Sequence, residues 1–262
     1  MKKFIPVFMI LLMLSTSAIA GTFNPFIVDV LERFETVNNA SDNVEQQLVN
    51  GTYRSVEMLE IIAYELDKTG VYKDYISNVK DTLISTDKAS DTSIQQAVNG
   101  TYRMTQMLEI IAYELNTGGA YSSFIESTMT KFKENNSNAS NALQQKVNGI
   151  YRTAELLEII AFEMNRSGQY SELISNIEDW MIDSNKNSSS AIQQAAVGFN
   201  AAAMYLTVIA KEADATGKFS EQISSSLNSL FNADLEYATH EQVNGSFRMV
   251  ELLSIWALCE DW

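Results

Sequence analysis

The sequence is poor in the residues that most often carry catalysis and metal binding. Cys259 is the only cysteine and His240 is the only histidine. An internal disulfide is therefore impossible, and zinc sites built on several histidines and Ser-His or Cys-His catalysis are disfavoured. The chain also lacks a glycine-rich phosphate-binding motif. We therefore predict no catalytic residue, no metal site and no cofactor.

Positive charge is scarce as well. The 18 Lys and Arg residues stand against 33 Asp and Glu residues, so the formal net charge is −15. An acidic surface repels phosphate backbones and gains no electrostatic energy at an anionic lipid surface. We therefore expect neither nucleic acid nor a membrane surface as a partner, and the simplest consequence of the charge is solubility.

The first twenty residues have the parts of a bacterial secretory signal. Lys2 and Lys3 form a basic start, the segment 4–14 is almost entirely apolar, and the segment 15–20 ends in Ala-Ile-Ala. The apolar run is shorter than the roughly 20 residues of a membrane span, and no other stretch is apolar enough to cross a membrane. We predict a signal peptide over 1–20, cleavage after Ala20, and a periplasmic or secreted protein without membrane insertion. A buried N-terminal helix is the weaker alternative.

Residues 21–262 form one domain that repeats with a period of 49 residues. The segment Gln-Gln-Leu-Val-Asn-Gly-Thr-Tyr-Arg at 46–54 returns, with small changes, at 95–103 and 144–152. A drifted copy begins at Gln193, and a fifth copy at 241–248 arrives two residues early. The repeats are 46–94, 95–143, 144–192 and 193–240, flanked by a half-repeat at 21–45 and a terminal half-repeat at 241–262.

Each repeat is predicted to be a pair of helices. In the second copy, apolar and small residues from about 93 to 115 fall on one face at helical spacing, and Gly119 then suits the left-handed residue that ends a helix. In the third copy, the segment 170–181 carries apolar residues at i, i+3, i+4, i+7, i+10 and i+11. The joints between repeats are rich in Ser, Asn and Asp, and no strand pattern appears. We predict an all-α fold of about ten helices.

A single helical hairpin cannot bury its apolar faces alone, so neighbouring hairpins must stack. The predicted architecture is an α-solenoid that resembles HEAT and armadillo repeats, although the period slightly exceeds their roughly 40–47 residues and no diagnostic motif of either is present. Because 23–34 matches 72–83, the domain begins with a lone second-type helix and ends with a lone first-type helix. These helices either cap an open superhelix, which we favour, or pair and close an α/α toroid.

The first helix of each repeat has changed much less than the second. Residues 46–70 and 95–119 share 18 identities in 25 positions, whereas 71–94 and 120–143 share 2 in 24. A glycine interrupts this first helix in all five copies, at a cost of about 1 kcal/mol relative to alanine. We interpret this glycine as a point where a neighbouring helix packs closely, in preference to a break into a turn and a helix.

The recurring polar residues of the first helix share one face. At 100° per residue, an asparagine, a tyrosine, an arginine and a glutamate or glutamine fall within one arc of the helix. They are Asn50, Tyr53, Arg54 and Glu57 in the first copy, Asn99, Tyr102, Arg103 and Gln106 in the second, and Asn148, Tyr151, Arg152 and Glu155 in the third. The fourth copy breaks the pattern with Val197, Asn200 and Ala201.

Two interpretations of this face are open. In the first, each arginine pairs with a carboxylate or amide of the adjoining repeat, in a ladder that fixes the register between repeats. In the second, the face is a ligand groove in which tyrosine and arginine make the contacts. The ladder is favoured, the two can coexist, and the twelve residues above are the candidate binding residues.

The predicted function is that of a non-enzymatic interaction module that binds a protein or peptide through its helical-repeat surface. The alternatives are a carbohydrate-active or other enzyme in a helical toroid, and an accessory domain of a secreted hydrolase. Glu60, Glu109 and Glu158 would suit paired acid–base chemistry. They follow the repeat, however, whereas catalytic residues usually break internal symmetry. Trp180 continues an apolar stripe and is predicted to be a core residue.

Overall fold

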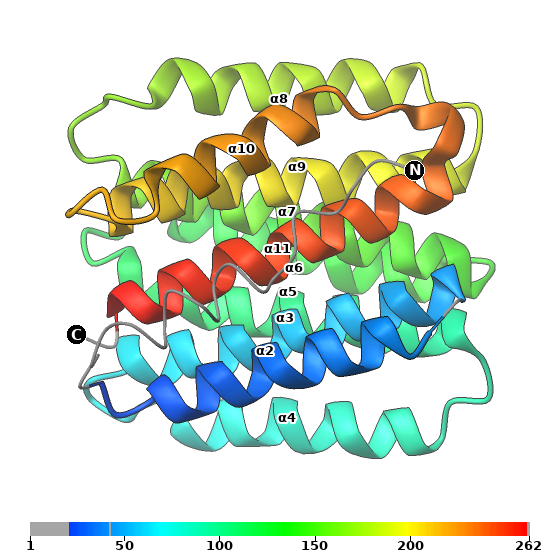
Figure 1. Cartoon of the computed structure of the whole chain (residues 1–262), viewed down its shortest axis with the longest axis horizontal. Coiled ribbons are helices and arrows are strands. Elements are labelled where there is room, and N and C mark those ends of the chain that lie inside the picture. The colour runs from blue at the N-terminus through cyan, green and yellow to red at the C-terminus, as the bar shows by residue number, and fades with distance from the viewer. Residues whose placement is uncertain (1–20, 42, 261–262) are drawn as a thin grey trace.

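The computed structural model describes residues 21–41 and 43–260. Residues 1–20, which carry the predicted signal peptide, lie outside the described residues, as do Asp42, Asp261 and Trp262. Ten α-helices and one short 3₁₀ helix occupy the described part, which contains no strand (Figure 1). The predictions of an all-helical chain and of about ten helices are confirmed.

Longer and shorter helices alternate along the chain. The longer helices are α3 (Val44–Leu66), α5 (Ser93–Leu115), α7 (Ala142–Met164), α9 (Ala191–Ala213) and α11 (Ala238–Glu260). The shorter helices are α2 (Asn24–Asn39), α4 (Lys73–Lys88), α6 (Ser122–Asn138), α8 (Ser171–Lys186) and α10 (Ser220–Phe231), and η1 (Leu235–Tyr237) precedes α11. The helix predicted from about 93 to 115 coincides with α5.

The five longer helices form a closed inner ring. α3 packs on α5, α5 on α7, α7 on α9 and α9 on α11, and α11 packs along α3 in the same way. Phe34 of α2 and Phe247 of α11 meet edge to face across this closure, with their ring centroids 4.8 Å apart. The favoured open superhelix is therefore wrong. Closure buries the apolar faces that the two terminal inner helices of an open stack would expose.

The shorter helices cover the outside of the ring. α2, α4, α6 and α8 each pack mainly on the longer helix that follows in the chain. α10 differs, because it packs mainly on α9 and little on α11. α9 is thus covered by both α8 and α10, and every residue from Ala195 to Ala210 is buried.

α9, which is covered by both α8 and α10, is unusually apolar. Among the described helices it alone is long and apolar enough to cross a membrane by length and composition, yet 83% of the relevant window is buried inside the protein. The expectation that no segment beyond the signal is so apolar is wrong by this measure. The reason is that Val197 and Ala201 stand where the other copies have asparagine and arginine.

The recurring glycines mark close contacts between inner helices, as predicted. A Cβ atom added to Gly100 would lie 2.6 Å from Thr52 Oγ1, and one added to Gly149 would lie 2.6 Å from Thr101 Oγ1. Gly51 faces Ser246 of α11 in the same way, which is the contact that closes the ring. Each glycine therefore lets its helix approach the previous inner helix closely.

Side chains at both ends of the longer helices satisfy backbone groups. Thr92, Asn141 and Ser190 accept backbone N–H groups at the starts of α5, α7 and α9. At the other end, Gly70, Gly119, Gly168 and Gly217 have φ between 70° and 73°. After each helix, the side chain of residue 67, 116, 165 or 214 accepts the N–H of the aromatic residue five positions later. These turns hold the two helices of each hairpin together.

One charged side chain links two inner helices that are not neighbours in the ring. Lys146 of α7 is buried and donates to Gln242 Oε1 of α11 at 2.7 Å. Burial lowers the pKa of Lys146 to about 8. The position is held by Leu48 and Ala97 in the first two copies, so the repeat pattern did not reveal this contact.

Candidate functional site

The recurring asparagines tie inner helices to outer helices. In each of three copies, the asparagine Nδ2 donates to a backbone oxygen sixteen residues earlier, at 2.9 Å. The pairs are Asn50 with Phe34, Asn99 with Leu83, and Asn148 with Phe132. Because the acceptors belong to the outer helices α2, α4 and α6, this part of the predicted binding face serves packing.

The recurring arginines pair within their own helices. The partner lies three residues later in each copy, as expected for side chains on one helical face. The distances are 2.7 Å for Arg54 to Glu57, 2.5 Å for Arg103 to Gln106 and 2.7 Å for Arg152 to Glu155. Among the described residues, no ion pair or hydrogen bond joins these three arginines to an adjoining repeat, so the predicted ladder of arginines is wrong. Bonds that do cross between repeats on this face include those from Arg33 to Glu57 and from Gln106 to Tyr75.

The recurring tyrosines have different surroundings in different copies. In the first copy, Tyr53 OH donates to Asp87 Oδ1 at 2.7 Å, and Gln96 Nε2 donates to the same oxygen at 3.0 Å. In the second copy, the ring of Tyr102 lies edge to face on Phe132, with centroids 4.9 Å apart. The hydroxyls of Tyr102 and Tyr151 have no hydrogen-bond partner among the described residues.

An open pocket of about 330 Å³ surrounds Tyr151 of the third copy. α7 forms its floor, and α6 and α8 flank it. It is lined by Asn135 and Asn138 of α6 and Ala139 directly after it, by Gln144, Val147, Asn148, Tyr151 and Arg152 of α7, and by Asn185 of α8 and Gln194 of α9. Six of these ten residues have amide side chains. We call this site the amide pocket.

Three buried polar atoms of the amide pocket have no hydrogen-bond partner within the described part of the chain. They are Asn148 Oδ1, Tyr151 OH and Arg152 Nε. A buried polar group without a partner costs about 1–3 kcal/mol. The pocket therefore favours an occupant that brings both donors and acceptors. Three of the twelve candidate residues meet here. The equivalent atoms of the second copy, Asn99 Oδ1, Tyr102 OH and Arg103 Nε, also lack a partner among the described residues, whereas Tyr53 in the first copy is bonded to Asp87.

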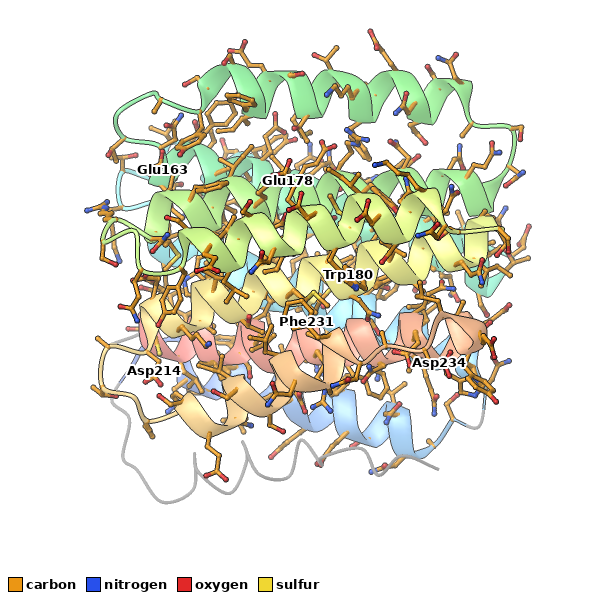
Figure 2. All side chains as sticks on the ribbon, turned by 90° about the horizontal axis from the view of Figure 1, so that it is seen from above. Glu163, Glu178, Trp180, Asp214, Phe231 and Asp234 are labelled. Carbon is orange, nitrogen blue, oxygen red and sulfur yellow. The ribbon has the colours of Figure 1, made fainter. Side chains whose placement is uncertain are left out.

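Carboxyl groups continue along the same faces of α7 and α8. Glu155 and Glu158 lie one and two helical turns after Tyr151, and Glu178 lies two turns before Asn185. Burial raises the pKa of Glu158 to about 7, and the negative charges of Glu178 and Glu155 add to this rise. Figure 2 shows Glu178 and Trp180 on opposite sides of α8. Trp180 packs against the hydrophobic core, as predicted.

Neither a metal site nor a similarity to a known protein indicates what the amide pocket does. Among residues 21–41 and 43–260, no group of three or more His, Cys, Asp or Glu side chains is placed to hold a metal ion. No protein-family model, no curated protein and no solved structure matches the chain significantly. The function must therefore be argued from the site itself.

A second pocket, of about 490 Å³, lies where the α8–α9 joint meets η1 and α11. His240, Tyr237 and Gln193 are among its lining residues. Gln193 Nε2 donates to the backbone oxygen of Leu235 at 3.3 Å, which links the two sides. None of the unpartnered buried atoms of the described residues belongs to its lining, so the amide pocket is the stronger candidate.

Sequence reasoning missed the residues that the outer helices and α9 contribute. All twelve candidates came from the first helices of the repeats, because those helices have changed least. Asn185 replaces Asp87 of the first copy, and Glu178 replaces Lys80. A comparison of the copies that looked for differences, and not for identities, would have found both positions.

Replacing Glu158 by glutamine should change how stability depends on pH. The pKa of Glu158 in the folded chain, about 7, lies above its ordinary value of 4.5. The folded state therefore holds the proton more tightly than the unfolded state, and its stability falls as the pH rises through this window. Glu158→Gln removes this loss, so the variant should gain about 1–3 kcal/mol on the unchanged protein between pH 4 and pH 8.

Urea unfolding at pH 4, 6 and 8 measures the difference. Glu134→Gln, an exposed position on α6, is the matched control and should run parallel to the unchanged protein. A Glu158→Gln curve that also ran parallel to it at every pH would show that the carboxyl is not held in a protonated state by its surroundings.

Proposed function

We propose that this chain is an exported, non-enzymatic interaction module that binds an extended peptide segment in the groove over α7, between α6 and α8. One observation carries the proposal: the amide pocket combines six amide side chains with buried atoms of Asn148, Tyr151 and Arg152 that have no partner in the described protein.

The chemistry of the amide pocket suits a peptide backbone. A side-chain amide offers N–H donors and a carbonyl acceptor, as the peptide group does. Asn148 Oδ1 can accept a backbone N–H, and Arg152 Nε can donate to a backbone carbonyl. Tyr151 OH can do either. A peptide therefore satisfies all three atoms without bringing a buried charge to the floor of the pocket, where Arg152 is already paired with Glu155.

The closed ring of inner helices also favours a binding site on the outside of the molecule. Side chains such as Thr101, Thr105 and Met107 of α5 are completely buried, so the helical faces that an open solenoid would offer to a ligand are used for packing. We propose further that the four hairpins and the two half-repeats are copies of one ancestral unit, and that export removes residues 1–20. Exported protein should then begin at Gly21, which N-terminal sequencing tests.

The test uses a variant that restores the closed arrangement of the first copy. Asn185→Asp places a carboxylate opposite Tyr151, where Asp87 faces Tyr53. The tyrosine hydroxyl and Gln194 should then bond to this carboxylate. Peptides selected from a random display library on residues 21–262 should lose at least about tenfold in affinity for this variant, or about 1.4 kcal/mol, as measured by fluorescence polarisation.

Asn136→Asp is the control, because it makes the same change at the equivalent position of the second copy. It should leave the affinity unchanged. Peptides that bind both variants equally well, or a library that yields no binder, would overturn the proposal. The carbohydrate-active alternative draws on Glu158 and Glu178, and it predicts an oligosaccharide that is hydrolysed by the unchanged protein and not by Glu158→Gln.

A further inference from the structure

Two helical turns beyond the amide pocket, α7 and α8 differ from the equivalent helices of the first copy by a reversal of charge. In the first copy, Lys80 Nζ lies 2.9 Å from Glu60 Oε1 and neutralises it. Glu158 is the third-copy equivalent of Glu60, and Glu178 is the equivalent of Lys80. A carboxylate therefore replaces the ammonium group that the repeat uses to balance this glutamate.

No other cation takes the place of Lys80 as a partner for Glu158. Glu155 is paired with Arg152 at 2.7 Å, and no ion pair or hydrogen bond to Glu158 is formed within residues 21–41 and 43–260. In the second copy, by contrast, Tyr75 OH lies 3.4 Å from Glu109 Oε2, and the positive charge of Lys133 acts on the same carboxylate. The third copy alone leaves two facing carboxylates without a cation.

A second observation concerns a buried tyrosine hydroxyl on α9. Tyr205 of α9 is 0% exposed, and its hydroxyl has no hydrogen-bond partner among the described residues. The equivalent positions in the first three copies are the apolar Met58, Met107 and Leu156. Tyr205 stands on α9, the helix that packs against both α7, which carries Glu158, and α8, which carries Glu178. Burial raises the pKa of its hydroxyl, and the negative charges of Glu158, Glu178 and Glu155 add to this rise.

We propose that Glu158, Glu178 and Tyr205 bind the cationic side chain, lysine or arginine, of the peptide that occupies the groove. This inference rests on the proposed function and names the class of peptide. An ammonium group offers three N–H donors and a guanidinium five, which suits two carboxylates and a hydroxyl acceptor. A bare metal ion fits less well, since no group of three potential ligands among the described residues is placed to hold one.

The spacing along α8 fits one extended peptide that spans both places. Asn185 of the amide pocket and Glu178 of the cation site are seven residues apart, which is about 10 Å along a helix. An extended chain rises by about 3.3 Å per residue. The basic residue should therefore stand about three positions from the residue that lies in the amide pocket.

The cation site can be tested without knowing the peptide. The probes are n-butylammonium and n-propylguanidinium chloride, titrated at neutral pH into protein labelled with carbon-13 at glutamate and tyrosine. We expect saturable shifts of the Glu158, Glu178 and Tyr205 signals. Glu178→Lys, which rebuilds the pair seen between Lys80 and Glu60, should weaken binding at least about tenfold while the melting temperature is kept.

Glu172→Lys is the control for net charge, because it makes the same change at an exposed position in the first turn of α8. It should leave cation binding unchanged. Signals that do not move, or that move equally with sodium chloride, would overturn the inference.

The peptide library separates this inference from the proposed function. Selected peptides that carry a lysine or arginine at one fixed position, and whose preference disappears in Glu178→Lys, support both. Peptides that bind without such a preference leave the proposed function in place and refute the inference. Binding of the small cations without any peptide binder supports the cation site and refutes the proposed function.

Discussion

A chain that ends at Asn232, without η1 and α11, should lose cooperative folding. α11 packs along both α3 and α9, and it buries Val243, Leu253 and Trp256. Each large apolar side chain removed from water contributes about 1.5–3 kcal/mol, and a whole domain is stable by only about 5–15 kcal/mol. The facing sides of α3 and α9 would meet water as well. Thermal melting followed by circular dichroism, with dye binding to apolar surface, measures this loss.

A circular permutant is the control for this truncation. It places residues 233–260 before residues 21–232, with a flexible linker from Glu260 to Gly21. In a closed ring, α11 still reaches α3 and α9 from this position, so the permutant should melt within a few degrees of the unchanged protein. The contrary result is a truncated chain that melts in one sharp transition and loses only the circular dichroism signal of η1 and α11. That result would contradict a ring whose stability depends on the packing of α11 against α3 and α9.

Replacing Gly100 by valine should destabilise the protein by about 3 kcal/mol, the upper part of the range for overpacked cores. A Cβ atom at this position would lie 2.6 Å from Thr52 Oγ1 and 2.8 Å from Thr52 Cβ. Thr52 cannot turn away freely, because its hydroxyl donates to the backbone oxygen of Val49 at 2.9 Å and the side chain is completely buried. α3 and α5 must therefore move apart. Urea unfolding gives the change in free energy.

Two further variants establish the cause of this effect. Gly118→Val adds the same side chain in an exposed turn, where an added Cβ would meet nothing within 4 Å. It should change stability by less than about 0.5 kcal/mol. Thr52→Ala combined with Gly100→Val removes Thr52 Oγ1, the nearest of the atoms that clash, and keeps Thr52 Cβ, so it should recover part of the loss. No recovery in the double variant would show that the close contact with the Thr52 hydroxyl is not the source of the cost.

Much of the secondary structure could be predicted from the sequence because its causes are local. α5 occupies Ser93–Leu115, as its apolar spacing predicts. Thr92 caps its start, and Gly119 adopts φ of 70° after its end. Each of these signals acts within a few residues. The glycine within the helix was also interpreted correctly, because a residue that weakens a helix recurs only where its missing side chain is useful.

The closure of the ring was decided by tertiary structure. A lone helix at each end of the domain is compatible with an open superhelix and with a ring, because the two helices can cap the ends of an open stack or pair with each other. The deciding quantity is the rotation from one inner helix to the next. That rotation depends on the volumes of contact residues such as Thr52 and Thr101 against their glycines, and its small increments add up over five helices.

The candidate site, too, was determined partly by the sequence and partly by the tertiary structure. The sequence by itself determined which polar residues recur, and three of them, Asn148, Tyr151 and Arg152, do line the amide pocket. Only the tertiary structure decided that Tyr53 is bonded to Asp87 while Tyr151 is left without a partner. A hydrogen bond between helices requires two atoms to meet within about 3 Å, and identical repeats do not ensure this. Single changes on the neighbouring outer helix, from Asp87 to Asn185 and from Lys80 to Glu178, therefore make the third copy different from the first.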